Sequence, residues 1–329
     1  MGQLVDGVWV GDPGTMDRTK QGRFQRSVTR FRDWITADGS SGFKAEAGRY
    51  HLYVCHACPW AHRTMIFRAL KGLEDVISVS VVSPLMMENG WEFGGYDGAT
   101  TDPINGADYM HQIYTRADPH YSGRASVPVL WDKEKATIVN NESAEIIRML
   151  NSAFDGFGDA GLDFYPQDLA AEIDAVNAPI YENINNGVYR CGFATTQEAY
   201  EEAFDALFAE LDRLEEVLAR QRYLLGSRLT EADWRLFTTL VRFDAVYNGH
   251  FKCNLRRIVD YPNLSGYLRE LYQVPGVAGT VNLDHIKTHY YYSHRSINPT
   301  GIVPVGPVLD FLAPHGRDAL PAEPLKRAA

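Results

Sequence analysis

The sequence has little of several features that would place a protein outside the ordinary globular class. No stretch of the 329 residues reaches the roughly 18 apolar residues that a membrane-spanning helix needs. Lys and Arg number 32 against 42 Asp and Glu, and this net charge of -10 argues against non-specific nucleic-acid binding. Four cysteines are too few for a disulfide scaffold in so long a chain. The clustered pair near the front is therefore a candidate for chemistry rather than for cross-linking.

The first residues also lack the marks of a targeting segment. They carry no basic region followed by an apolar stretch, as a secretory signal would, and no myristoylation pattern. We therefore expect a cytoplasmic protein with no membrane partner. A hydrophobic content of 45% and a charged content of 22% are typical of soluble globular proteins, and the length suits two domains.

The first half of the chain predicts an extended arm followed by a mixed domain. Residues 1–48 are rich in Gly, Asp, Arg and Ser, and we expect an extended arm that packs its large aromatic side chains onto the rest: Trp9, Phe24, Phe31 and Trp34. The domain that follows, residues 49–155, opens with a predicted strand at 50–54, a helix after Cys58-Pro59 and a second strand at 76–82. A long polar stretch at 83–124 is of the length that usually serves function. A predicted hairpin (127–132 and 136–140) and a helix (142–150) complete the order β-α-β, β-β-α of a thioredoxin-like domain.

The second half predicts helices alone. Apolar residues recur at helical spacing, and we expect an all-α domain over residues 164–280. Thr195 to Glu198 reads as a capping box before a long amphipathic helix, and Thr230 to Asp233 reads as a second box. Pro262 is expected to begin a helix that runs to about residue 272. The remaining residues, 281–329, form a predicted tail that wraps the surface.

Cys58 is the residue on which the functional interpretation rests. A thiol reacts as its thiolate, and the free N–H groups and dipole of a helix N-terminus lower the pKa of a cysteine placed there. The strand–Cys58-Pro59–helix order predicts that position for Cys58. An isolated cysteine is more often buried and inert, and it is the local context that favours a reactive one.

Two alternatives concern the neighbours of Cys58. Cys55 and Cys58 could form a redox dithiol, but a thioredoxin-type pair has its second cysteine at the position of Ala61, so Cys58 is expected to act as a single thiol. Cys55, Cys58 and His62 could bind zinc, but no second Cys/His pair follows at a suitable spacing, so we predict no metal. His62 is expected to be packed or solvated.

A single-thiol site on this fold needs a thiol co-substrate, and glutathione is the usual one. The residue before a cis-proline can pair with the peptide-like part of glutathione, which points to Val127 and Pro128. A helix N-terminus can hold the γ-glutamyl carboxylate, which points to Glu142 and Ser143. An ordinary edge-strand proline and a simple helix cap are the plain alternatives for these residues.

Several motifs together resemble one family, the glutathionyl-hydroquinone reductases, or Xi class of glutathione transferases. The motifs that carry the resemblance are YVCHACPWAHRT (53–64), SVPVLWDK (126–133), NNES (140–143), NNGVYRCGFA (185–194), TEADWR (230–235) and YNGHFKC (247–253). The resemblance covers roughly residues 45–307. It implies a thioredoxin-like N-terminal domain, an all-α C-terminal domain and a homodimer.

The resemblance also implies a reaction and roles for named residues. Cys58 would attack the glutathionyl sulfur of an S-glutathionyl-hydroquinone, and a second glutathione would release glutathione disulfide, a chemistry suited to quinone detoxification. Tyr189 would protonate the leaving aromatic carbon, while Tyr247 and Tyr290 would stabilise the Cys58 thiolate. Trp91 and Arg124 would contact glutathione. Each of these aromatic residues could instead belong to the core.

One departure and two other functions remain open at this point. Cys55 stands where the family has serine, so a Cys55–Cys58 disulfide could form under oxidation. An Omega-like transferase acting on dehydroascorbate or mixed disulfides would share Cys58, Pro128 and Ser143, but would not need the tyrosines. A partner-binding protein built on the same fold would have no use for the nucleophile.

Overall fold

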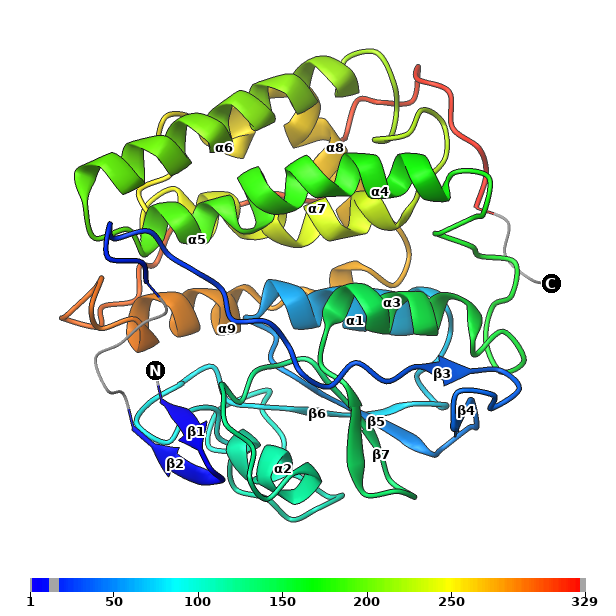
Figure 1. Ribbon diagram of the computed structural model, residues 1–329. Helices are drawn as coiled ribbons and strands as arrows, with labels where there is room; N and C mark the ends of the chain where they lie inside the picture. Colours follow the sequence, from blue (N-terminus) through cyan, green and yellow to red (C-terminus); the bar gives the residue numbers. More distant parts are fainter. Residues whose placement is uncertain (1, 12–17, 326–329) are drawn as a thin grey trace.

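The computed structural model describes residues 2–11 and 18–325, and Figure 1 shows a helical layer stacked on a layer that contains the main sheet. The main sheet has the strand order β6-β5-β7-β8, formed by Ser78–Val81, Tyr50–Val54, Val129–Asp132 and Thr137–Asn140. β5 runs parallel to β6 and antiparallel to β7, which pairs antiparallel with β8. Every residue of β5 is buried, so this strand lies at the centre of the domain.

Helices cover both faces of this sheet. α1 (Pro59–Leu70) and α3 (Ser143–Ser152) lie between the sheet and the helical layer, and α2 (Met110–Ala117) lies on the opposite face (Figure 1). The predicted strands, hairpin and helices of this region are confirmed. α2 is a further helix, which lies within the long polar stretch and was not predicted from the sequence. The connection from β5 through α1 to β6 is the β-α-β unit expected for two parallel strands.

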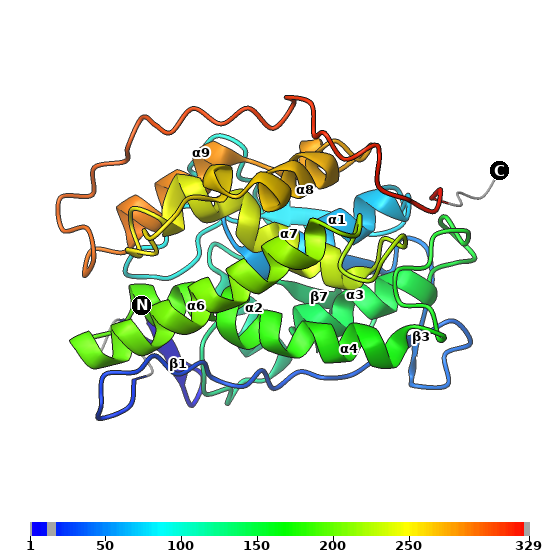
Figure 2. The same cartoon turned by 90° about the horizontal axis from the view of Figure 1, so that it is seen from above.

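The second half of the chain is mostly helical and is seen from above in Figure 2; in Figure 1 its last helix lies level with α1 and α3, and the others form the helical layer. Its α-helices are α4 (Ala170–Pro179), α5 (Gly187–Gly192), α6 (Gln197–Leu218), α7 (Glu231–Arg242), α8 (Pro262–Tyr272) and α9 (Leu283–Thr288). Three π-helical turns are η1 (Ile180–Asn185), η2 (Phe243–Tyr247) and η5 (His289–Ser293); two short 3-10 turns are η3 (Ile258–Asp260) and η4 (Ala278–Thr280). α8 begins at Pro262 and ends at Tyr272, as predicted.

The two predicted capping boxes have different outcomes. Thr230 and Asp233 form a true capping box at the start of α7. The side chain of Thr230 accepts from the backbone amide of Asp233, and the carboxylate of Asp233 accepts from the backbone amide of Thr230. At α6 the cap is Thr196, whose hydroxyl accepts from the Ala199 amide at 3.3 Å, so the predicted box from Thr195 is wrong by one residue. Thr195 instead donates its amide to the carbonyl of Gly22 in the N-terminal arm.

The N-terminal arm has more structure than an extended segment. β1 (Gln3–Val5) and β2 (Val8–Val10) form a hairpin, and β3 (Ile35–Thr36) pairs parallel with β4 (Phe43–Lys44). Between them, residues 18–33 run across the front of the molecule between the two layers (Figure 1). Phe24 and Phe31 pack against the core as predicted, whereas Trp34 is 37% exposed, so its predicted packing is wrong.

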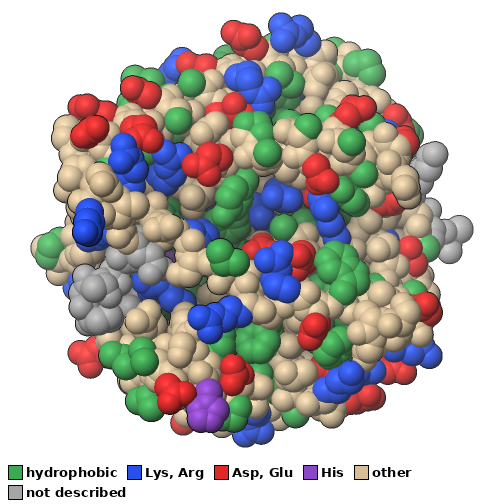
Figure 3. Space-filling view, viewed as in Figure 1, with side chains coloured by type: hydrophobic (Ala, Val, Ile, Leu, Met, Phe, Trp, Pro, Cys, Tyr) green, Lys and Arg blue, Asp and Glu red, His purple; other side chains and the backbone are tan. Residues whose placement is uncertain are grey.

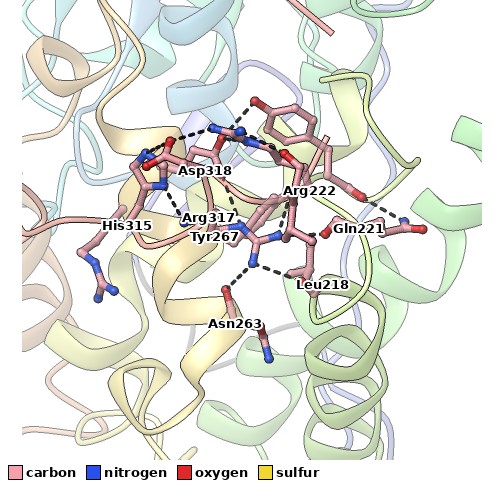
Figure 4. Close-up of polar contacts among 12 residues, drawn as sticks. Leu218, Gln221, Arg222, Asn263, Tyr267, His315, Arg317 and Asp318 are labelled. Atoms are coloured by element: carbon pink, nitrogen blue, oxygen red, sulfur yellow. Dashed lines mark hydrogen bonds and ion pairs between the residues drawn. The ribbon is translucent and has the colours of Figure 1, made fainter. Parts of the chain in front are cut away.

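A buried arginine of the C-terminal tail is among the residues that hold the tail to the helical layer (Figure 4). Arg317 donates to the carbonyl oxygens of Leu218, Gln221 and Arg222, which lie at and beyond the end of α6. Carbonyls at a helix C-terminus have no partner within the helix, so the Arg317 guanidinium caps α6 from 95 to 99 residues away along the chain. The segment predicted as a wrapping tail, 281–329, thus begins with two helical pieces at 283–288 and 289–293, and Arg317 fixes its later part to α6.

Among residues 2–11 and 18–325, no helix is both long and apolar enough to cross a membrane.

Candidate active site

Cys58 lies at the N-cap of α1, directly after the central strand β5. Its backbone is extended (φ -76°, ψ 120°), its carbonyl accepts the first helical hydrogen bond from His62, and Pro59 occupies the first helical turn. This confirms the predicted position of the thiol. The Cys58 Sγ also lies 3.5 Å from the Val127 carbonyl oxygen, to which it donates.

A cavity of about 610 Å³ brings together nearly all of the predicted site residues. The predicted residues that line it are Cys58, Trp91, Arg124, Val127, Pro128, Glu142, Ser143, Tyr189 and Tyr290. Figure 3 shows the front face hollowed between the two layers, with apolar and Lys/Arg side chains gathered there. Residues from both domains and from the arm therefore face one space that is large enough for a tripeptide and an aromatic ring.

The pKa of the Cys58 thiol is shifted in the direction opposite to the predicted one. Burial raises the pKa of the Cys58 thiol above its usual value, while the amides of Ala61 and Trp60 and the charges of Arg242 and Arg26 act in the opposite direction. The predicted lowering by the helix N-terminus is therefore present as an influence, but the predicted net direction is wrong. Desolvation wins because Cys58 lies between two packed domains.

A buried arginine of the helical domain fixes the loop that carries Cys58. Arg242, at the end of α7, donates Nε to the Ala57 carbonyl at 2.9 Å and Nη2 to the His56 carbonyl at 2.8 Å. Its Nη1 donates to Nδ1 of His62, whose Nε2 bonds the Thr280 hydroxyl. This arginine joins the two domains at the turn just before the thiol, and it explains the packing of His62.

The three predicted tyrosines are connected by their hydroxyls. Tyr189 and Tyr290 lie 2.5 Å apart between hydroxyl oxygens, and Tyr290 and Tyr247 lie 3.0 Å apart. Tyr189 and Tyr290 line the cavity, whereas Tyr247 is not a lining residue and contacts the hydroxyl of Tyr290 from behind. Burial raises the pKa of all three, which keeps the hydroxyls protonated and able to donate at neutral pH.

The position of these tyrosines depends on irregular helix geometry. Tyr247 closes the π-helical turn η2, Tyr290 lies in the π-helical turn η5, and Tyr189 lies in α5 directly after the π-helical turn η1. Single π-helical turns are rare and are frequent at functional sites. No local sequence signal used above predicts them.

The predicted glutathione-binding groups lie along one wall of the cavity. The Val127–Pro128 peptide bond is cis, as predicted. Glu142 is the N-cap of α3, with its carboxylate accepting from the Ala144 amide, and the hydroxyl of Ser143 accepts from the buried Arg63 at 3.4 Å. These groups present backbone polar atoms and a helix N-terminus to the same space as Cys58.

The other two residues predicted to contact glutathione are Trp91 and Arg124, and both line the same cavity. Trp91 is buried and stacks on His289, with ring centroids 4.7 Å apart. Arg124 follows Gly123, which pairs with Leu4 of the N-terminal hairpin. Both line the cavity and come from the long segment between β6 and β7.

Several lining residues were not predicted as site residues. They are Phe24 and Arg26 from the arm, Trp60 from α1, Phe193 from the end of α5, and His289 and His294 from the tail. Their positions depend on how the arm and the tail pack, so no local sequence pattern identifies them as site residues. The aromatic side chains of the arm were the one sequence feature that indicated a contact with the rest of the protein. No group of three or more His, Cys, Asp or Glu among the described residues could hold a metal ion.

Cys55 is buried and, unlike Cys58, does not line the cavity. It is 1% exposed, burial raises its pKa to about 12, and its carbonyl accepts from the Cys58 amide at 3.1 Å. All four cysteines are free. A Cys55–Cys58 disulfide therefore requires that Cys58 be oxidised first, after which the Cys55 thiol can attack.

We expect Cys55→Ser to keep activity and to remove a slowly reactivated form of peroxide-treated protein. Peroxide converts the Cys58 thiol to sulfenic acid, and attack by the Cys55 thiol then forms the disulfide and releases water. Peptide mapping after peroxide treatment measures the linkage, with Cys253→Ala as the control for loss of a buried thiol. The absence of a Cys55–Cys58 disulfide from the peptide map of the peroxide-treated, unsubstituted protein would contradict this prediction.

Comparison with known proteins places this site in a family. Residues 57–153 match the family described as glutathione S-transferase, N-terminal domain, and residues 197–270 match glutathione S-transferase, C-terminal domain. The chain is 58% identical to glutathionyl-hydroquinone reductase YqjG of Escherichia coli (strain K12), over 97% of this chain and 99% of that protein. It is 60% identical to glutathionyl-hydroquinone reductase PcpF of Sphingobium chlorophenolicum, over 93% and 96% of the two chains.

Solved structures agree with the sequence comparisons. The glutathione-bound structure of YqjG superposes with a TM-score of 0.89 at 56% identity, covering 97% of this chain and 99% of that one. A Xi class glutathione transferase from Natrialba magadii superposes with a TM-score of 0.91 at 53% identity, covering 98% of each chain. The predicted fold class, a thioredoxin-like domain followed by an all-α domain, is confirmed. The chain belongs to the glutathionyl-hydroquinone reductases, the Xi class of the glutathione transferases.

Proposed function

We propose that this protein reduces S-glutathionyl-hydroquinones to hydroquinones at the expense of glutathione. The observation that carries the proposal is that the thiol of Cys58 and the paired hydroxyls of Tyr189 and Tyr290 line one cavity. The relatives at 58–60% identity that bear the name glutathionyl-hydroquinone reductase support the same reaction. An Omega-like exchange with a mixed disulfide would use the Cys58 thiol but would not need the two tyrosine hydroxyls, because its leaving group is a thiolate that requires no proton.

The first half-reaction transfers the glutathionyl group to the protein. The Cys58 sulfur, as thiolate, attacks the glutathionyl sulfur, an S–S bond forms, and the bond from sulfur to the aromatic carbon breaks. The aromatic carbon takes a proton and the hydroquinone leaves, so the ring carbon is reduced as the two sulfurs are oxidised. Because carbon is a poor leaving group unless it is protonated, this step needs an acid close to the thiol.

The tyrosine pair is suited to that need. We assign the proton donor to Tyr189, because its hydroxyl lies on the cavity wall and stays protonated in its buried site. Tyr290 and Tyr247 continue the hydroxyl chain behind it, so that charge arising on Tyr189 or on Cys58 is shared through hydrogen bonds. The second half-reaction, attack by free glutathione on the Cys58–glutathione disulfide, releases a thiolate and needs no such acid.

Glutathione is the co-substrate, and the cavity wall opposite the helical layer suggests how it is held. We assign the cysteinyl part to the backbone at Val127, the residue before cis-Pro128, whose carbonyl lies 3.5 Å from Cys58 Sγ. The γ-glutamyl carboxylate is assigned to the N-terminus of α3 at Glu142 and Ser143. Trp91 and Arg124 are assigned to the remaining part of glutathione.

A steady-state assay tests the function. Purified protein is given a panel of glutathionyl-hydroquinones with glutathione, and hydroquinone and glutathione disulfide are quantified together. The proposal expects the two products in a one-to-one ratio. Turnover of dehydroascorbate or of small mixed disulfides without any turnover of the glutathionyl-hydroquinones would instead support the Omega-like reaction.

We also propose a homodimer, supported by apolar side chains that the tail leaves in solvent. The exposed apolar residues of the tail are Ile302 (69%), Val305 (97%), Val308 (99%) and Leu312 (74%). Exposed apolar side chains that lie within one short segment of chain are typical of a surface that another chain covers. A second copy of the chain is the partner that the family resemblance implies.

Light scattering at micromolar concentration should therefore give about twice the chain mass of 37.0 kDa. Val305→Asp combined with Val308→Asp should shift the protein toward the single-chain mass, because a carboxylate buried in the contact carries a desolvation cost. Val8→Asp, at a 65% exposed position of the N-terminal hairpin, is the control. A mass near 37 kDa for the unsubstituted protein would refute the dimer.

We place the protein in the cytoplasm as part of the same proposal. Its four cysteines are free, and its reaction consumes glutathione, conditions that belong to a reducing compartment.

A further inference from the structure

The N-terminal arm contributes to the cavity wall as well as covering it. At one end of residues 18–33, the Gly22 carbonyl accepts from the Thr195 amide at 3.1 Å, and Arg23 pairs with Glu202 at 2.8 Å. At the other end, the Asp33 amide donates to the Val139 carbonyl at 3.0 Å. The arm is thus tied to the helical domain and to the sheet and crosses from one to the other (Figure 1), and Phe24 and Arg26 of the arm line the cavity.

Between these anchors, Arg26 points its guanidinium at the aromatic residues next to the thiol. Its Cζ lies 4.8 Å from the ring centroid of Trp60, 4.8 Å from that of Tyr189 and 5.3 Å from that of Phe24. The Nε donates to the side chain of Asn186 at 3.1 Å. A guanidinium held by three ring faces and one hydrogen bond has a fixed direction.

One nitrogen of this guanidinium has no partner. Nη2 of Arg26 is buried and makes no hydrogen bond to any described residue, and no ion pair of Arg26 occurs within the described part of the chain. A buried donor left without an acceptor costs about 1–3 kcal/mol, and more when the donor is charged. Because Arg26 lines the same cavity as Cys58 and Tyr189, the missing acceptor is best supplied by the substrate.

We propose that Arg26 is a further catalytic residue, whose Nη2 donates to the phenolic oxygen of the glutathionyl-hydroquinone beside the scissile C–S bond. The inference rests on the proposed function and adds to it the group that receives the negative charge of the leaving ring. Aromatic faces at Phe24, Tyr189 and Phe193 form the adjacent wall, where an aromatic ring can pack.

The electron movement explains why a cation is needed at that oxygen. Proton transfer from Tyr189 to the ring carbon bonded to sulfur, with return of the phenolic proton to the tyrosine hydroxyls, gives the keto tautomer of the substrate, in which the neighbouring oxygen is a carbonyl. When the Cys58 thiolate attacks the glutathionyl sulfur, the C–S electron pair enters the ring, the ring becomes aromatic again, and the carbonyl π pair moves onto the oxygen. The products are the Cys58–glutathione disulfide and a hydroquinone monoanion, so atoms and charge balance. A fixed cationic donor at the oxygen stabilises this charge most strongly at the transition state.

The electrostatics of the site agree with this placement. The positive charge of Arg26 is among the influences that lower the pKa of both the Cys58 thiol and the Tyr189 hydroxyl, so the guanidinium lies close to both reacting side chains. In a cavity walled by aromatic rings, a charge interaction of this kind is screened far less than in water.

The test compares two substrates with leaving groups of different kinds. We expect Arg26→Met to lower kcat for a glutathionyl-hydroquinone on the order of a hundredfold, as removal of one oxyanion donor does elsewhere. The mixed disulfide of glutathione with 2-mercaptoethanol leaves as a thiolate and makes no phenolate, so its turnover should change less than about threefold. Arg26→Lys, which keeps the charge, should recover part of the loss. Arg256→Met, in the helical domain and paired with Asp212 outside the cavity, should leave both activities unchanged.

A second readout separates catalysis from support of the arm. Chlorine substituents on the ring make the phenol more acidic, so its anion needs less help, and the loss caused by Arg26→Met should shrink as chlorines are added. Added methylguanidinium should restore activity to Arg26→Ala, which also serves if the methionine variant folds poorly. Equal losses on both substrates, no loss on either, or a loss independent of ring acidity would each overturn the inference. If the unsubstituted protein fails to turn over any glutathionyl-hydroquinone, the proposed function itself is wrong, and the inference falls with it.

Discussion

Cys58→Ala should lower the turnover of glutathionyl-hydroquinones on the order of 10⁴-fold or more, that is, to background. Loss of a covalent nucleophile has effects of this size, because the remaining groups can bind the substrate but cannot form the intermediate. The structure supports the assignment, since Cys58 is the cysteine that lines the cavity and caps α1, whereas Cys191 and Cys253 are 3% and 0% exposed in the helical domain.

Cys191→Ala and Cys253→Ala are the matched controls. Each removes one buried sulfur, so we expect a modest loss of stability of about 1 kcal/mol and less than a twofold change in kcat. Treatment with glutathione disulfide should place one glutathionyl group on Cys58, which mass spectrometry of the digested protein detects. An adduct found mainly on Cys191 would show that the nucleophile has been assigned wrongly.

Tyr189→Phe should lower kcat for glutathionyl-hydroquinones on the order of a hundredfold or more, because general acid catalysis contributes about 10²–10⁴-fold. The substitution keeps the ring, including its contacts with Phe193 and Phe251, and removes the hydroxyl that lies 2.5 Å from Tyr290. The expected loss is specific to substrates in which a ring carbon must take a proton.

A small mixed disulfide of glutathione is the comparison substrate for this variant. It should keep most of its turnover, because its leaving group is a thiolate and needs no proton. Tyr247→Phe is the matched control: it removes a hydroxyl of the same chain, but one that stands behind Tyr290 and outside the cavity lining, so its loss should be smaller. Equal losses on both substrates would show that Tyr189 acts on the thiol or on glutathione binding, and no loss would return it to a packing role.

The parts of the fold that the sequence predicted are those governed by local rules. β5, α1 and β6 were recognisable because β-branched runs and helical spacing are properties of neighbouring residues, and Pro59 marks the helix start that places Cys58. The cis bond before Pro128 and the cap at Thr230 depend on a few adjacent residues in the same way.

The parts that the sequence did not predict depend on contacts between distant segments. Arg242 holds the turn before Cys58 from 185 residues away, and Arg317 caps α6 from about a hundred residues away. Arg26 reaches the cavity because the arm is anchored at both ends. Nothing in the neighbourhood of these arginines in the sequence distinguishes them from surface charges.

The pKa of Cys58 shows the same division. The local argument, a thiol at a helix N-terminus, gives an influence that the structure contains, since the amides of Trp60 and Ala61 do lower the pKa. The opposing desolvation comes from packing of the helical domain and arm around the thiol, which is a tertiary property, and it reverses the sign of the net shift.

A single-turnover experiment tests the central claim most directly. The protein is mixed with an excess of a glutathionyl-hydroquinone in the absence of free glutathione, then quenched and examined by mass spectrometry and by quantification of the hydroquinone. The account predicts one equivalent of hydroquinone per chain and one glutathionyl group on Cys58, with further product appearing when glutathione is added. Hydroquinone that forms only after glutathione is added, with Cys58 never modified, would contradict it.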